Sequence, residues 1–215
     1  MPALTPRSLP DQLAERLRER ILSGAAAPGA PIRQDALAAE LGVSKIPLRE
    51  AMARLEQEGL LRSEANRGYF VRELSAGEAR EVYALRLKLE PAAAAEAAAH
   101  AAEADRIAAR AALDALDRAI AAHGEGTGAL NRAFHLALVR PARRLVTLEI
   151  IERLHILSER YVRKHLEPHG RDTRANREHR DLLAAWLARD GGKVASLLHA
   201  HIAQTHDDLE RQLGT

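Results

Sequence analysis

The sequence contains no cysteine, and this absence excludes several kinds of chemistry. A chain without thiols forms no disulfides, has no thiolate nucleophile and binds no metal through sulfur. Such a composition suits a reducing compartment, so we expect a cytoplasmic location. The first residues, MPALTPRSLPDQ, lack the apolar stretch of a signal peptide, and no apolar run approaches the roughly 18 residues of a membrane span. We therefore expect no membrane partner.

Aromatic residues are also scarce: they make up 3% of the chain, whereas hydrophobic residues make up 47%. Alanine and leucine supply most of the apolar positions, which favours closely packed helices over a β-rich core. A chain of 215 residues has room for one ordinary domain and a smaller one. We expect a mainly α protein of two domains. The net charge of +2 argues by itself neither for nor against nucleic acid.

The N-terminal third shows three helical patterns and then a change of period. The runs LPDQLAERLRERILSG and RQDALAAELG predict two helices, the second of which ends at Gly42. A third helix follows Ser44, a suitable N-cap, with Pro47 in its first turn. After Gly59, LLRSEANRGYFVREL predicts two short strands, at 60–62 and 69–72, joined by a turn at 66–68. This order predicts a winged helix-turn-helix DNA-binding domain in residues 1–73.

Residues 74–215 show only helical patterns. Ser75 and Glu78 have the spacing of a capping box at the start of a long helix. The segments HGEGTG and EPHGRDT, Pro141, and the pair Gly191-Gly192 separate the patterns that follow. We predict about six helices, packed as an all-α antiparallel bundle. To this second domain we assign metal binding, effector binding and dimerisation.

The third predicted helix carries the clearest candidates for DNA recognition. Its apolar stripe leaves Lys45 and Arg49 exposed near its N-terminus, where a recognition helix meets the major groove. Arginine can pair with guanine through two hydrogen bonds, and a serine at a helix N-terminus suits a phosphate. Taken singly, each such residue is an ordinary solvated surface residue; a complete winged helix favours DNA contact. The predicted DNA-binding residues are Arg33, Ser44, Lys45, Pro47, Arg49, Asn66, Arg67 and Gly68, of which Arg67 at the hairpin tip is expected to enter the minor groove.

Three later helices each carry a histidine on the face that also bears apolar residues. In NRAFHLAL, Asn131 and His135 are four residues apart and share one face, and His179 and His201 lie on two further helices. Three neutral imidazoles and an oxygen suit zinc, nickel or a similar divalent ion, with positions left for water or a ligand. The alternative is that each histidine is hydrogen-bonded locally or lies on the surface. Spacing alone leaves both readings open, because six other histidines are available as decoys: His123, His155, His165, His169, His199 and His206.

The motifs LRERILSG, SKIPLREAM, LEQEGLL and RLKLE resemble the GntR family of bacterial transcription regulators. The C-terminal part resembles the FadR-like branch, which carries a helical ligand-binding domain called FCD. The resemblance covers roughly residues 8 to 213. It departs from the family at Lys45, where arginine is more frequent, and lysine gives up bidentate base readout.

The resemblance also implies a ligand set and a signal. The FCD elements D/N-x-x-F-H, EH and HI match Asn131, His135, His179 and His201. Asn131 is a departure, because a neutral amide neutralises a dication less well than a carboxylate. The implied effector is a small organic acid or related metabolite bound beside the metal. Arg86 in RLKLE is a candidate contact for its carboxylate, although an ion pair with Glu90 is the alternative.

These observations favour a ligand-responsive transcription regulator, a repressor that binds a palindromic operator as a homodimer. The alternative is a metal-dependent hydrolase that uses the histidine cluster. Against it, the chain has no HExxH motif and no nucleophile arrangement, and Glu178 faces a different way from its neighbour His179 on a helix. An architectural DNA binder would be strongly basic. We therefore expect no enzyme.

Overall fold

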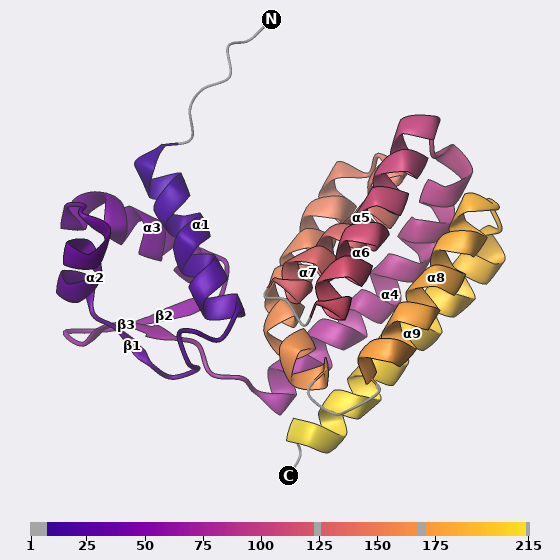
Figure 1. Cartoon of the computed structure of the whole chain (residues 1–215). Coiled ribbons are helices and arrows are strands. Elements are labelled where there is room, and N and C mark those ends of the chain that lie inside the picture. The colour runs from indigo at the N-terminus through magenta and orange to yellow at the C-terminus, as the bar shows by residue number, and fades with distance from the viewer. Residues whose placement is uncertain (1–7, 123–125, 167–170, 214–215) are drawn as a thin grey trace, which may run out of the picture. The chain divides into compact units, whose positions relative to one another are not determined.

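A computed structural model describes residues 8–122, 126–166 and 171–213, without the side chains of 162–166 and 172 (Figure 1). The chain divides into two compact units, residues 1–73 and 74–215. Within the described residues, the first unit contains three helices and a small sheet, and the second contains helices and no strand. The predicted fold class, a winged helix-turn-helix followed by a helical bundle, is confirmed.

The first unit is built on two amphipathic helices. The apolar faces of α1 (Leu9–Leu22) and α3 (Lys45–Gln57) pack against each other, and α2 (Gln34–Leu41) packs on α3. Gly42 ends α2 in the left-handed conformation (φ 64°), as its place in the sequence predicts. Ser44 occupies the N-cap position of α3, but its hydroxyl makes no capping hydrogen bond. The buried side chains of α1 and α3 include Leu13, Leu17, Ile21, Leu48, Met52 and Leu55.

The sheet of this unit has three antiparallel strands in the order β1-β3-β2. The predicted hairpin appears as β2 (Leu61–Glu64) and β3 (Gly68–Val71), each shifted by one or two residues from its predicted bounds. The strand β1 (Pro31–Ile32) was not predicted. It has two residues within a Pro/Gly-rich turn, and only its pairing with β3 makes it a strand.

The second unit contains six α-helices within the described residues, in agreement with the expected number. The large buried side chains between them include Phe134 and Trp186, whose indole N–H donates to the backbone oxygen of Leu138 at 3.0 Å. Among the described helices, none has both the length and the apolar character needed to cross a bilayer. The helices are α4 (Ala76–His100), α5 (Glu103–Ala121), α6 (Thr127–Val139), α7 (Leu145–Leu166), α8 (Arg171–Leu187) and α9 (Gly191–Leu213), with a short 3₁₀ turn, η1 (Arg140–Ala142), after α6.

Helix α4 packs along α9. The alanines Ala94, Ala97 and Ala98 of α4 are fully buried. At the start of α9, a Cβ added to Gly191 would lie 3.3 Å from the backbone oxygen of Ala95, so the two backbones approach closely there. The absence of a side chain at Gly191 therefore lets α9 lie close to α4 at this point.

The predicted capping box at the start of α4 is only half formed. The Ser75 hydroxyl accepts a hydrogen bond from the Glu78 N–H at 3.3 Å, as expected. The Ser75 N–H, however, donates to the hydroxyl of Tyr161 on α7 at 3.1 Å, and the Glu78 carboxylate accepts from that hydroxyl at 2.6 Å. Packing of α7 against α4 brings Tyr161 to this place, and the local spacing carried no sign of it.

Candidate functional site

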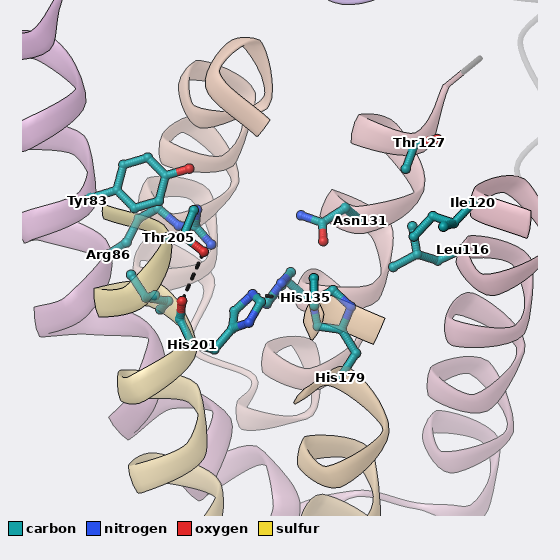
Figure 2. Close-up of a pocket in the computed structure, with 12 residues that line it drawn as sticks. Tyr83, Arg86, Leu116, Ile120, Thr127, Asn131, His135, His179, His201 and Thr205 are labelled. Carbon is teal, nitrogen blue, oxygen red and sulfur yellow. Dashed lines mark hydrogen bonds between the residues drawn. The ribbon is translucent and has the colours of Figure 1, made fainter. Parts of the chain in front are cut away.

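The three histidines selected from the sequence come together from three helices. His135 lies on α6, His179 on α8 and His201 on α9. Their ring centroids are 5.2 Å (135–179), 5.3 Å (135–201) and 4.7 Å (179–201) apart. The Nε2 atoms of His179 and His201 are 3.3 Å apart, and each ring offers a nitrogen within 4.8 Å of the others. Figure 2 shows the imidazoles turned toward a common point.

The environment of two of these rings, those of His135 and His179, keeps them neutral. His135 and His179 are buried, and burial lowers the pKa of both well below the usual value, with repulsion from neighbouring imidazoles acting in the same direction. Within the described residues, both ring nitrogens of His135 and Nδ1 of His179 have no hydrogen-bond partner. Buried nitrogens without partners are costly. A divalent ion such as zinc or nickel, which prefers neutral imidazole, fits this donor set.

The third imidazole, that of His201, contacts a carboxylate. Glu178 Oε2 accepts a hydrogen bond from His201 Nδ1 at 2.7 Å. This contact places the proton on Nδ1 and leaves the lone pair of Nε2 directed at the cluster. Glu178 and His179 thus contact different nitrogens of the same ring, and no pattern in the sequence predicts that α9 brings His201 to Glu178.

Asn131 lies in the wall of the pocket that also contains the three histidines. Its amide lies near His135 in Figure 2, one helical turn away on α6. The pocket has an empty volume of about 470 Å³, including space open to solvent. It is lined by Tyr83, Arg86, Leu116, Ile120, Thr127, Asn131, His135, Ala175, His179, His201, Ile202 and Thr205.

Arg86 lines this pocket and is also engaged in a buried ion pair. Its Nε donates to Glu90 Oε1 at 2.6 Å, its Nη2 to Glu90 Oε2 at 3.2 Å and its Nη1 to the Ser158 hydroxyl at 3.2 Å. Burial would raise the pKa of Glu90, but the Arg86 guanidinium and His155 together lower it to about 2. The ion pair with Glu90, which was the alternative to an effector contact, is thus formed.

His155 is a residue that the sequence did not single out. It lies on α7, is buried, and places its Nε2 3.2 Å from Glu90 Oε2. Its ring centroid is 5.3 Å from that of His135. Burial lowers its pKa, and Glu90 opposes that shift. Of the other histidines considered, His199 is exposed and His206 half-buried, whereas His123, His169 and the side chain of His165 lie outside the described residues.

The predicted DNA-binding residues of the helices lie at the adjoining ends of α2 and α3. Arg33, Ser44, Lys45 and Arg49 are exposed, and Pro47 is half-buried in the first turn of α3. Lys45 pairs with Asp35, and Arg49 Nε donates to Gln34 Oε1 at 3.3 Å. Both cations therefore contact the first turn of α2, and both are accessible.

The wing residues Asn66 and Arg67 lie in the turn between β2 and β3, whereas Gly68, predicted in the turn, is the first residue of β3. Asn66 (φ 61°) and Gly68 (φ 89°) adopt the left-handed conformation that this turn requires. Arg67 is exposed, pairs with Glu64 and lies over the ring of Phe70, 5.2 Å from its centroid. A DNA contact by Arg67 would exchange the Glu64 carboxylate for a phosphate or a base edge.

Ile46 on α3 was missing from the predicted set. It is 72% exposed, lies between Lys45 and Pro47, and makes no part of the core of this unit. The signal that could have revealed it is its position off the apolar stripe of a helix otherwise well patterned. An exposed isoleucine in the first turn of a recognition helix can contact the methyl group of thymine.

Comparison with known proteins assigns each of the two units to a family. The family model described as "FCD domain" matches residues 81–204, and that described as "Bacterial regulatory proteins, gntR family" matches residues 9–71. BphR, an uncharacterized HTH-type transcriptional regulator of Paraburkholderia xenovorans, is 29% identical over 223 residues, covering 100% of this chain and 90% of that protein. The solved structure of E. coli McbR/YncC matches with a TM-score of 0.83 and 26% identity, covering 96% of this chain and 99% of that one.

Some curated relatives match only in part. YdhC of Bacillus subtilis, an uncharacterized HTH-type transcriptional regulator, is 38% identical over 79 residues, which are 37% of this chain and 35% of that protein. The alignment with it therefore spans about a third of its length. All of these similarities are to regulators of transcription, in agreement with the expectation that the chain is not an enzyme.

Proposed function

The chain belongs to the GntR family of bacterial regulatory proteins and carries an FCD domain, and on this premise we propose that it is a cytoplasmic repressor that binds a palindromic operator as a homodimer. Its effector is a small organic acid, which binds beside a divalent metal ion in the pocket of the second unit. The observation that carries this proposal is the convergence of imidazole nitrogens without partners and a buried arginine on one pocket.

The metal ligands in this proposal are Asn131, His135, His179 and His201. An imidazole binds a metal ion through a ring nitrogen that carries no proton. The neutral state of His135 and His179 therefore supports the assignment, because no proton has to be displaced before metal binds. The ion would supply a positive charge that attracts a carboxylate. The Glu178 carboxylate holds His201 in the tautomer that offers Nε2.

The DNA-binding residues in this proposal have different tasks. Lys45 and Arg49 contact base edges in the major groove, the Ser44 hydroxyl contacts a phosphate, and Arg67 contacts the minor groove. The remaining predicted residues position these contacts or lie beside them: Arg33, Pro47, Asn66 and Gly68. Two copies are needed because one small reading head rarely supplies enough specific affinity, and a symmetric dimer matches a palindrome.

Coupling between the effector and DNA has a covalent route through α4. Only four residues, 72–75, separate the end of β3 from the start of α4, and α4 carries Tyr83 and Arg86 in the pocket wall. An effector alters operator affinity only if it binds the two arrangements of the dimer with different affinity.

The first test is the metal content of the full chain, purified without a histidine tag and without chelator. We expect stoichiometric metal in the wild type and in His199→Ala, and its loss in His201→Ala; His199 is an exposed residue of the same helix. Thermal-shift measurements with small carboxylic acids, on loaded and stripped protein, then test the effector. Equal metal in both variants would exclude this ligand set. Acid binding that is the same with and without metal would exclude a shared pocket.

A further inference from the structure

The hydroxyl of Tyr83 is a buried polar group in the effector pocket that the metal-binding proposal does not use. Tyr83 lies on α4 with an exposed fraction of 0%, and it lines the pocket with Arg86 and Thr205. In Figure 2 its hydroxyl points away from the α4 backbone toward the space that the other labelled side chains surround. Within the described residues, the oxygen has no hydrogen-bond partner.

The neighbouring guanidinium of Arg86 does not satisfy this hydroxyl. The guanidinium carbon of Arg86 lies 5.1 Å from the centroid of the Tyr83 ring. Arginine has donors only, so even a contact with the phenolic oxygen leaves the phenolic hydrogen without an acceptor. Burial raises the pKa of Tyr83 to about 12, and the phenol therefore remains protonated at neutral pH. A buried donor without an acceptor is costly, which makes it a strong candidate for a ligand contact.

The polar groups near Tyr83 are engaged with other partners: the Glu90 carboxylate accepts from Arg86, and the His206 ring stacks on Tyr83 with a centroid distance of 6.1 Å. The Thr205 hydroxyl donates to the backbone oxygen of His201 at 3.0 Å. Arg86 uses three N–H groups on Glu90 and Ser158, and guanidinium has five. This wall of the pocket thus presents an O–H and unused N–H groups, which suit an anionic oxygen.

The polar groups of the pocket form two sets, which lie on different helices. Tyr83 and Arg86 lie on α4, whereas the histidines lie on α6, α8 and α9. A ligand with two acidic groups can place one at the histidines and the other at Tyr83 and Arg86. We propose that Tyr83 donates a hydrogen bond to a second carboxylate of the effector, and that it makes the protein selective for dicarboxylic over monocarboxylic acids. This inference rests on the proposed function, because the first carboxylate binds at the metal.

The test compares acids that differ only in the second carboxylate. The full chain, loaded with Zn²⁺, is titrated with malonate, succinate and glutarate and with their counterparts propionate, butyrate and valerate. We expect the wild type to bind at least one dicarboxylate about 10-fold or more tightly than its counterpart. Tyr83→Phe should lose most of this preference by weakening dicarboxylate binding alone, with unchanged zinc content. Tyr69→Phe, which removes a phenol from the winged unit, should behave as the wild type.

The outcomes separate the inference from the proposal beneath it. A preference for dicarboxylates that persists in Tyr83→Phe would overturn the inference and leave the metal and effector site intact, as would equal binding of both acid classes by the wild type. Failure of the zinc-loaded wild type to bind any acid would overturn the effector proposal and the inference together. The unliganded variant gives an independent result: removal of an unpaired hydroxyl should maintain or raise Tm, and a clear fall in Tm would show a partner within the protein.

Discussion

Glu178 on α8 holds His201 on α9 through a hydrogen bond of 2.7 Å between Oε2 and Nδ1. The two residues come from helices that each supply one imidazole to the candidate metal site, so the bond both joins the helices and fixes a tautomer. Carboxylates in this position typically raise metal affinity without touching the metal.

We therefore predict that Glu178→Ala lowers zinc affinity about 10- to 100-fold. Glu178→Gln, which keeps an acceptor, should lose less. Asp181→Ala removes an exposed carboxylate from the same helix and serves as the control. Competition with a chromogenic chelator measures the affinities. If the two alanine variants bind zinc equally well, the hydrogen bond has no role in metal binding.

The stability of the metal-free protein should depend on pH through His135 and His179. Their pKa values lie well below 6.5 in the folded state, so below pH 6.5 the unfolded chain binds more protons than the folded one. The free energy of unfolding should consequently fall as the pH decreases below about 6.5 and receive no contribution from these groups above it. Urea unfolding with chelator present, between pH 8 and 5, measures this slope.

His135→Asn should have a shallower slope in the same experiment, because one of the neutral buried imidazoles is gone. His100→Asn, at an exposed position on α4, should keep the slope of the wild type. Identical slopes in all three proteins would mean that the cluster accepts protons freely when folded. Added zinc should move the loss of stability to lower pH, since metal and protons compete for the same nitrogens.

Replacement of Arg49 by alanine should cost about 1–3 kcal/mol of specific operator binding and relax the choice of base at one position. Titration of labelled operator at fixed salt gives the affinity, and a library of operator variants gives the specificity. Arg110→Ala, on α5, makes the same change in net charge within the other unit. A uniform weakening for all sequences would assign Arg49 to a phosphate.

Ile46 should contribute through a thymine methyl group. Replacing one operator thymine by deoxyuridine removes only that methyl, which should weaken wild-type binding by about 0.8 kcal/mol at the contacted position. Ile46→Ala should bind the thymine and deoxyuridine operators equally at that position. A methyl dependence of equal size in both proteins would remove Ile46 from the interface.

Much of the fold follows from local patterns. Gly42, Gly59 and Pro141 end helices as their backbone preferences require, and the apolar stripes of α1 and α3 face one core. The two-residue strand β1 could not be predicted. Its pairing with β3 defines it as a strand, and no local propensity does so. Tyr161 replaced half of a capping box for a similar reason: its contact with Ser75 joins residues 86 apart in sequence.

The candidate site also combines residues that sequence patterns predict with residues that they do not. The three histidines share faces with apolar residues, so periodicity predicts that they point inward, and the structure brings them together. Glu178, His155 and Tyr83 have no such signal, because what each contacts depends on which helices become neighbours. Arg86 was ambiguous between an effector contact and Glu90; it pairs with Glu90 and still lines the pocket.

The close approach of α4 and α9 affects the dimensions of the candidate site. His201 lies on α9, which packs along α4, and at Gly191 the backbones of the two helices approach closely beside Ala95. A larger side chain at Gly191 would press against the Ala95 backbone and move α9, and His201 with it, relative to His135 and His179. Under the proposed function, the response to metal would then depend partly on residues that contact neither ion nor effector. A genetic screen for altered metal response should recover substitutions at Gly191 and Ala95 as well as among the histidines.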